Sequence, residues 1–130
     1  MKRLTAFLAT LLLTALVALG GEKFPDISHA DLKKAIAEKR VTLIDVNGSE
    51  TYKAGHIPGA LDFATAEAGL AGRLPADKAA LIVAYCADEH CGAFAFAAAV
   101  ARELGYTNVR HYSPGIVGWE KAGEKTEPGA

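Results

Sequence analysis

A short apolar run, Leu81 to Tyr85, ends directly on Cys86, and this arrangement constrains the fold more than any other feature of the chain. Continuous apolar runs of this length are typical of strands that are buried on both faces, as in a parallel sheet. The Ala-rich residues that follow predict a helix, with Gly105 just beyond its end. In open α/β sheets the ligand crevice lies beyond the carboxyl ends of the strands. Cys86 is therefore expected where such proteins carry out chemistry.

The remaining sequence alternates between predicted helices and predicted strands. Apolar residues at helical spacing and turn residues predict helices over residues 29–39, 65–73, 92–104 and 116–121. Short apolar runs predict strands over residues 41–46, 60–63, 80–85 and 108–112. Alternation of this kind favours parallel pairing through right-handed crossovers, and hence a three-layer α/β domain. Residues 50–53 are expected to form at most one helical turn, and residues 123–130 a frayed polar tail.

The N-terminus has the three marks of a secretory signal peptide. Met1-Lys2-Arg3 is basic, residues 4–19 are almost wholly apolar, and Ala18-Leu19-Gly20 closes the run on small residues. We therefore assign residues 1–20 to the signal peptide and residues 21–130 to one domain. The run has sixteen residues, three of them threonine, and is shorter than the roughly 20 residues that span a bilayer, and an uncleaved anchor is the alternative. The predicted location is the periplasm or the exterior, without stable membrane association once the signal is removed.

Charge argues against a nucleic-acid partner. The formal charge is −1, and removal of residues 1–20 takes away two basic residues and no acidic one, which leaves −3. Nucleic-acid binding proteins instead carry basic patches or stripes. A chain of about 110 residues can bury one hydrophobic core, and we expect a monomer.

The only two cysteines are Cys86 and Cys91. A disulfide between them would close a very short loop and add little to fold stability, although exported proteins do form disulfides. A reactive or reversible pair is therefore a better interpretation than a structural staple. A thiol at a helix N-terminus can have its pKa lowered from about 8.5 to between roughly 3.5 and 7.5. The alternative for Cys86 is a buried apolar side chain without reactivity.

Four segments together resemble the single-domain rhodaneses, in the order and spacing of that family. They are Leu43-Ile44-Asp45-Val46, Gly55-His56-Ile57-Pro58-Gly59-Ala60, Val83-Ala84-Tyr85-Cys86 and Gly115-Ile116-Val117-Gly118-Trp119-Glu120-Lys121-Ala122-Gly123. The resemblance implies a five-stranded parallel sheet flanked by helices. It also implies a sulfurtransferase in which Cys86 accepts a sulfane sulfur as a persulfide and passes it to a thiol acceptor, without a metal or organic cofactor.

The resemblance also assigns the surrounding site residues. The active-site loop would cradle the sulfur with backbone N–H groups and consists of Ala87, Asp88, Glu89, His90, Cys91 and Gly92. Asp45 is expected to order neighbouring loops, and His56 to be hydrogen-bonded within its Gly-Pro turn. Trp119 is expected in the core or at the rim.

The loop departs from the family pattern in its charge. Asp88 and Glu89 are acidic, whereas rhodanese loops often carry Arg or Lys, and Asn47 replaces a frequent basic residue. Two like charges about 4 Å apart repel by roughly 1 kcal/mol in water and about 4 kcal/mol at an effective dielectric constant of 20. We therefore predict a small-molecule or protein sulfane-sulfur donor other than the thiosulfate dianion.

Cys91 is the second departure, because the common pattern has a basic residue there. As a resolving cysteine it would attack a persulfide or sulfenate on Cys86 and form an intramolecular disulfide. Alternatively, Cys91 packs beneath the first helical turn and does not react. The competing function is a non-catalytic module that binds a partner or senses redox state through a reversible Cys86–Cys91 disulfide.

Two other kinds of site are disfavoured. His56 and His90 with the cysteines are zinc or copper ligand types, but the cysteine spacing matches no common zinc knuckle, and we predict no metal site. A phosphatase of related fold needs a Cys-x5-Arg cradle, and Gly92 stands at the position of the arginine.

Overall fold

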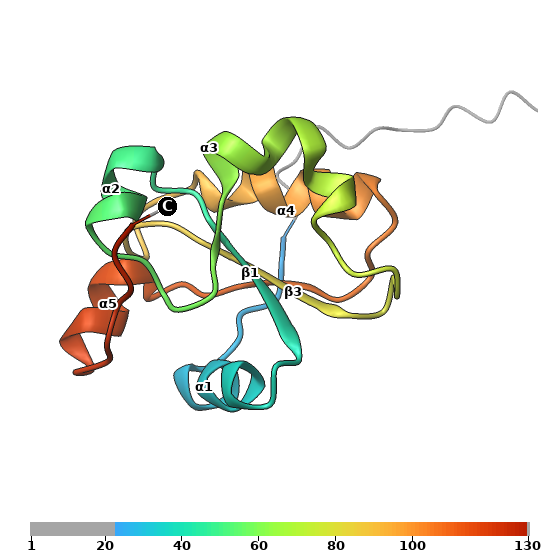
Figure 1. The fold of residues 1–130 in the computed structure, drawn as a ribbon. Coiled ribbons are helices and arrows are strands. Elements are labelled where there is room, and N and C mark those ends of the chain that lie inside the picture. Colours follow the sequence, from blue (N-terminus) through green and yellow to red (C-terminus); the bar gives the residue numbers. More distant parts are fainter. Residues whose placement is uncertain (1–22, 130) are drawn as a thin grey trace, which may run out of the picture.

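The structure, a computed structural model, describes residues 23–129 and contains one parallel sheet (Figure 1). Its strands are β1 (Val41–Asp45), β2 (Leu61–Asp62), β3 (Leu81–Tyr85) and β4 (Val109–His111), in the order β2-β1-β3-β4. All three pairings are parallel, and β1 and β3 align Asp45 with Tyr85 at their carboxyl ends. The predicted α/β class and parallel pairing are confirmed.

Helices cover both faces of the sheet, as Figure 1 shows for α1 on one side and for α3 and α4 on the other. The helical elements are α1 (His29–Ala37), α2 (Ser49–Ala54), α3 (Phe63–Ala66) with the 3₁₀ helix η1 (Glu67–Gly72), α4 (Phe94–Glu103) and α5 (Gly115–Lys121). Two apolar clusters fill the layers. One contains Ile44, Ile82 and the Ala residues of α4. The other contains Leu32 of α1, Leu43 and Val83. Adjacent strand residues thus point to opposite layers, and both layers are apolar.

The predicted fifth strand is wrong for the described residues. The segment before α1 lies beside β4, but it forms only one bridge, between Asp26 and His111. Two hydrogen bonds of 2.9 Å support it, from Ile27 N–H to the His111 carbonyl and from His111 N–H to the Pro25 carbonyl. Pro25 has no N–H to extend the ladder, and Ser28 already caps α1 by accepting from Asp31 N–H. The segment is therefore too short to count as a strand.

Three local predictions also need correction. The helix predicted over residues 65–73 is divided into α3 and η1, and Gly69 has non-helical backbone angles there. Residues 50–53 belong to α2, which is longer than one turn. The helix predicted from residue 92 begins at Phe94, so Cys91 lies in the loop and not in the first turn. The first difference is a break inside a predicted helix, and the other two concern element ends.

The signal peptide predicted at residues 1–20 lies outside the described residues. Among residues 23–129, every helix is too short or too polar to cross a membrane.

Candidate active site

Cys86 directly follows β3 at the carboxyl edge of the sheet and is only 1% exposed. A disulfide joins it to Cys91, with the two Cα atoms 6.2 Å apart, a separation within the range that disulfides adopt. Cys91 is partly exposed, whereas Cys86 is buried. The two predicted reactive residues are therefore brought into direct contact, with unequal access to solvent.

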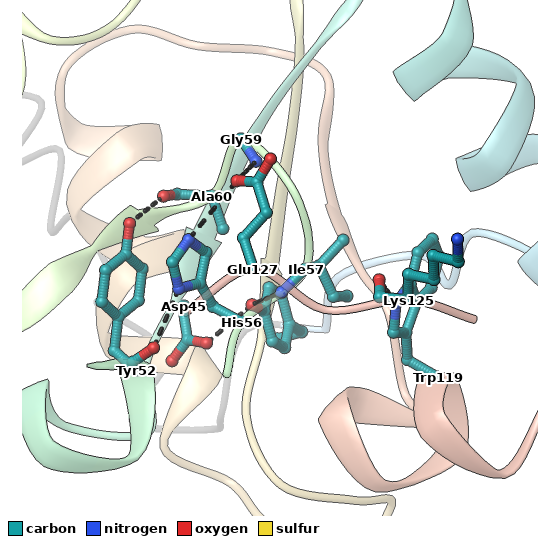
Figure 2. A network of polar contacts seen from close by, with 10 residues as sticks. Asp45, Tyr52, His56, Ile57, Gly59, Ala60, Trp119, Lys125 and Glu127 are labelled. Atoms are coloured by element: carbon teal, nitrogen blue, oxygen red, sulfur yellow. Dashed lines mark hydrogen bonds and ion pairs between the residues drawn. The ribbon is translucent and has the colours of Figure 1, made fainter. Parts of the chain in front are cut away.

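Tyr85, immediately before Cys86, is fixed by a buried network at the ends of β1 and β3. Its hydroxyl donates to Asp45 Oδ2 at 2.6 Å and accepts from Ile57 N–H at 3.0 Å. Asn47 N–H donates to Asp45 Oδ1 at 2.8 Å. Asp45, which Figure 2 shows close to the Ile57 segment, thus joins the loop after β1 to the strand that carries Cys86.

Burial dominates the electrostatics of this network. It raises the pKa of Asp45, although the hydrogen bonds from Tyr85 and Asn47 oppose the shift. Burial and the neighbouring Asp45 carboxyl also raise the pKa of Tyr85. Tyr85 therefore keeps its proton and acts as a donor to Asp45, which is a positional role for both residues.

The start of α5 holds Cys86 from its other side. The Cys86 carbonyl accepts from Ile116 N–H and the Ala87 carbonyl from Val117 N–H, both at 3.0 Å. Gly115 permits this approach, because an added Cβ would lie 2.5 Å from the carbonyl oxygens of Cys86 and Ala87. Its φ of +60° also lies in the left-handed region. The Gly-Ile-Val-Gly-Trp segment therefore contributes backbone support to the cysteine.

The loop itself is acidic and is held by local bonds. Cys91 N–H donates to the Asp88 carbonyl at 3.2 Å, and His90 N–H donates to Asp88 Oδ1 at 2.9 Å. Glu89 and His90 are exposed, and His90 Nε2 lies 3.7 Å from Glu89 Oε1. Within residues 23–129, the backbone N–H groups of Ala87, Asp88 and Glu89 have no protein acceptor. The loop thus combines unpaired donors with carboxylates and contains no Lys or Arg.

The predicted supporting residue His56 lies beside Asp45 and Ile57 and has polar contacts of its own with Tyr52 and Glu127 (Figure 2). Its Nδ1–H donates to the Tyr52 carbonyl at 2.8 Å, and its ring stacks on Tyr52 with centroids 3.7 Å apart. Its Nε2 lies 3.7 Å from Glu127 Oε2. No hydrogen bond of His56 within the described residues reaches the loop 87–92. His56 therefore shapes the turn before Ile57, which in turn contacts Tyr85.

The C-terminal tail closes this network, contrary to the predicted fraying. Glu127 and His56 exchange two backbone hydrogen bonds of 2.9 Å, and the Glu127 carboxylate accepts from Gly59 N–H at 3.2 Å. Gly129 N–H donates to the Lys53 carbonyl. Sequence reasoning missed this pairing, because one polar residue in a polar tail carries no periodic signal.

Trp119 of α5 packs in the apolar cluster that also contains Leu43 and Val83. Within the described residues it forms no hydrogen bond with the loop 87–92. Its Nε1–H donates to the Lys125 carbonyl at 2.9 Å, and its ring contacts His29 and Tyr112. It is 4% exposed. Trp119 thus anchors the tail to α5, and its link to Cys86 is indirect, through the first residues of that helix.

His111 is a buried titratable residue that sequence reasoning did not single out. Its ring stacks on Phe94, the first residue of α4, with centroids 3.4 Å apart. Nδ1 lies 3.3 Å from Asp26 Oδ1, and the buried Nε2 has no partner in the structure. Burial lowers the pKa of His111. The feature that could have identified His111 is its position at the end of β4, where that strand meets the N-terminal side of α4.

Among residues 23–129, no three His, Cys, Asp or Glu side chains are grouped in a way that could hold a metal ion.

The fold and the site together define a class of protein. It is a parallel α/β domain with a thiol or disulfide at the end of its central strand. The profile of the rhodanese-like domain matches residues 28–122. The chain belongs to the rhodanese-like domain family, as the four sequence segments predicted.

Two curated relatives differ in what they do. Human thiosulfate:glutathione sulfurtransferase is 34% identical over 108 residues, which cover 73% of this chain and 92% of that protein. An HTH-type transcriptional regulator of Mycobacterium tuberculosis is 37% identical over 105 residues, which cover 80% of this chain but only 45% of the regulator. The chain thus spans less than half of the regulator and is related to sulfurtransferases over nearly the whole length of the human enzyme.

Solved structures agree on the fold. The human single-domain sulfurtransferase TSTD1 is 27% identical, with a TM-score of 0.61 over 76% of this chain and 97% of that chain. The BH2092 protein of Bacillus halodurans is 26% identical, with a TM-score of 0.63 over 80% of this chain and 77% of that chain. The rhodanese-like fold therefore rests on both sequence and structure.

Proposed function

We propose that this protein is a sulfurtransferase that carries a sulfane sulfur as a persulfide on Cys86. The observation that carries the proposal is the position of Cys86, buried at the carboxyl end of β3 and followed by three unpaired backbone N–H groups. Such donors stabilise the anionic form of a thiol or persulfide. The relationship to the human sulfurtransferase supports the same chemistry.

The proposed cycle begins with the reduced protein, after the Cys86–Cys91 bond has been opened by a thiol. The Cys86 thiolate attacks the outer sulfur of a donor persulfide, and the donor leaves as its thiolate. An acceptor thiolate then attacks the outer sulfur on Cys86, which returns to the thiolate. Each step exchanges one sulfur nucleophile for another, so the cycle requires no metal or organic cofactor.

We propose that the donor is a small-molecule or protein persulfide and not thiosulfate. Asp88 and Glu89 are adjacent to the loop donors, and the loop has no Lys or Arg to offset them. A dianion approaching Cys86 meets repulsion that a neutral or singly charged donor largely avoids. The signal-like N-terminus supports action after export, in the periplasm or outside the cell. We propose that the protein acts as a monomer.

A second candidate is a non-catalytic module that senses redox state. The specific observation that favours it is the Cys86–Cys91 disulfide. In this case the oxidised and reduced loops would present different surfaces to a partner, and no sulfur would be transferred.

The test is persulfide formation on the reduced protein under anaerobic conditions. Wild type, Cys91→Ser and Cys86→Ser are incubated separately with glutathione persulfide and with thiosulfate, and intact mass spectrometry measures the gain of one sulfur atom. We expect Cys91→Ser to gain one sulfur from glutathione persulfide and to yield thiocyanate with cyanide. Cys86→Ser is expected to gain none. Absence of any adduct on Cys91→Ser with either donor, while Cys86 still reacts with an alkylating agent, would refute the enzyme and leave the redox module.

A further inference from the structure

The two sulfurs of the loop differ in how firmly they are held and how accessible they are. Cys86 is fixed on both sides, by Tyr85 in the Asp45 network and by the hydrogen bond from Ile116 to its own carbonyl. In the part of the chain that the structure describes, the N–H groups of His90 and Cys91 donate to Asp88 within the same loop. Cys91 is also the more exposed of the two. Cys91 is therefore the less constrained member of the pair, and Cys86 the more constrained one.

We propose that Cys91 cleaves the Cys86 persulfide and releases its outer sulfur as hydrosulfide, which makes the protein a persulfide reductase. This inference rests on the proposed persulfide of Cys86. The Cys91 thiolate attacks Sγ of Cys86, and the bond between Sγ and the outer sulfur breaks. Hydrosulfide leaves with the electron pair, and the Cys86–Cys91 disulfide forms. The sulfane sulfur is reduced to sulfide while the two thiols are oxidised.

Geometry favours attack on the inner sulfur of the persulfide. In the loop conformation of the structure, Sγ of Cys91 and Sγ of Cys86 are in bonding contact as a disulfide. In the same arrangement Cys86 Sγ lies 3.2 Å from the Cys91 carbonyl oxygen. Cys91 thus already lies against the Cys86 sulfur that its thiolate must attack.

The acidic loop is suited to the release of the product. Hydrosulfide is an anion, and Asp88 and Glu89 lie in the same loop as the bond from which it departs. Like charges there disfavour rebinding of the anion. The carboxylates that disfavour thiosulfate as a donor therefore favour loss of hydrosulfide.

An external dithiol of protein or small-molecule origin would complete the cycle. It attacks the partly exposed Cys91 sulfur, forms a mixed disulfide and displaces Cys86 as the thiolate. Its second thiol then releases Cys91 and leaves the reductant as a disulfide. Over the whole cycle, a donor persulfide and a dithiol yield the donor thiol, hydrosulfide and an oxidised dithiol.

A single-turnover experiment tests the inference. Reduced wild type and Cys91→Ser are each mixed anaerobically with one equivalent of glutathione persulfide, without further reductant. Hydrosulfide is measured by methylene blue formation and protein thiols by alkylation. Wild type should release close to one hydrosulfide per chain and lose both thiols to the disulfide. Cys91→Ser should retain the persulfide and release at least an order of magnitude less hydrosulfide.

The outcomes separate the inference from the function on which it rests. If the persulfide of wild type is lost no faster than the persulfide of Cys91→Ser, Cys91 does not resolve it and the inference is wrong. If Cys91→Ser acquires no persulfide at all, the proposed sulfurtransferase function fails instead. Cys91→Ala serves as a second variant, and near-native circular dichroism of both variants excludes misfolding as the cause.

Discussion

Gly115 lies against the backbone of Cys86 so closely that a Cβ on Gly115 would be 2.5 Å from the Cys86 carbonyl oxygen. The contact allows Ile116 N–H to donate to that same carbonyl at 3.0 Å. The cysteine is therefore fixed by a helix start that follows it by almost thirty residues in the sequence.

Replacement of Gly115 by Ala should lower the free energy of unfolding by more than about 2 kcal/mol. Left-handed backbone angles alone cost an L-residue roughly 1–2 kcal/mol, and the new Cβ also displaces the Cys86 carbonyl. Gly59→Ala is the matched control, because Gly59 has a φ of +84° but nothing within 4 Å of the added Cβ. Urea unfolding of the reduced chain measures both. If both variants lost the same free energy of unfolding, α5 would be able to move away from the Cys86 carbonyl without cost.

Removal of the Tyr85 hydroxyl should cost about 2–4 kcal/mol at neutral pH. Tyr85→Phe leaves Ile57 N–H without its acceptor and Asp45 Oδ2 without its donor, both in a buried site, while Asn47 N–H still donates to Asp45 Oδ1. Tyr112→Phe is the control, since the Tyr112 hydroxyl has one hydrogen-bonding partner, His29, which is only partly buried. Thermal and urea unfolding should place Tyr85→Phe well below Tyr112→Phe in stability.

The cost of Tyr85→Phe should also decrease as the pH falls. Burial raises the folded pKa of Asp45 above its ordinary value of 3.8, so the stability associated with its protonated form is lost as pH rises through the folded pKa. The Tyr85 hydrogen bond opposes that rise, and its removal makes the charged carboxylate more costly. Acidification below the folded pKa of the variant neutralises Asp45 and removes that part of the penalty. If the loss of unfolding free energy caused by Tyr85→Phe did not change with pH, Asp45 would not be charged in the folded protein.

His111 should make wild type less stable in mild acid. Burial lowers its folded pKa below the ordinary 6.5, so the unfolded chain binds more protons and stability falls as pH drops through 6.5 toward the folded value. His111→Phe retains an aromatic ring against Phe94 but does not titrate. The stability of this variant relative to wild type should therefore increase between pH 7.5 and pH 5.5. A constant difference across that range would assign the acid sensitivity to other groups.

The strands and the position of Cys86 could be predicted because burial on both faces leaves a continuous apolar run in the sequence. The family segments likewise singled out Asp45 as a residue that orders neighbouring loops. What the sequence could not supply were contacts that depend on backbone groups alone. The pairing of Glu127 with His56 and the single bridge at Asp26 are of this kind, since any residue except proline can form them. The disulfide depends on the conformation of residues 87–91, and no periodic pattern in the sequence predicts that conformation.

The tail should protect the His56 turn from local opening. A chain that ends at Thr126 lacks both backbone bonds with His56 and the bond from Gly129 to the Lys53 carbonyl, with an expected cost of about 2 kcal/mol. Glu127→Ala keeps these backbone bonds and should cost less than about 1 kcal/mol, because its carboxylate is exposed. Hydrogen exchange at His56 N–H distinguishes the two variants. Unchanged protection in the truncated chain would show that the tail is dispensable.

Charge in the loop should determine how well thiosulfate reacts with Cys86. Asp88→Asn retains an oxygen to accept from His90 N–H, and together with Glu89→Gln it removes two negative charges with little change in shape. We expect kcat/KM for thiosulfate to rise several-fold in the double variant, while kcat/KM for an alkyl persulfide, which carries at most one negative charge, changes less. Added salt should raise the thiosulfate value in wild type, because it screens the repulsion, and have a smaller effect in the double variant.

Asp77→Asn is the matched control for that experiment. Asp77 also accepts from a backbone N–H two residues later, at 2.9 Å, but it precedes β3 and so lies at the opposite end of the strand from Cys86. Its loss should leave the thiosulfate kinetics unchanged. If Asp77→Asn raised kcat/KM as much as the loop variant, net charge and not the charge beside Cys86 would govern the reaction. If neither variant had an effect, the loop carboxylates would not be what limits thiosulfate.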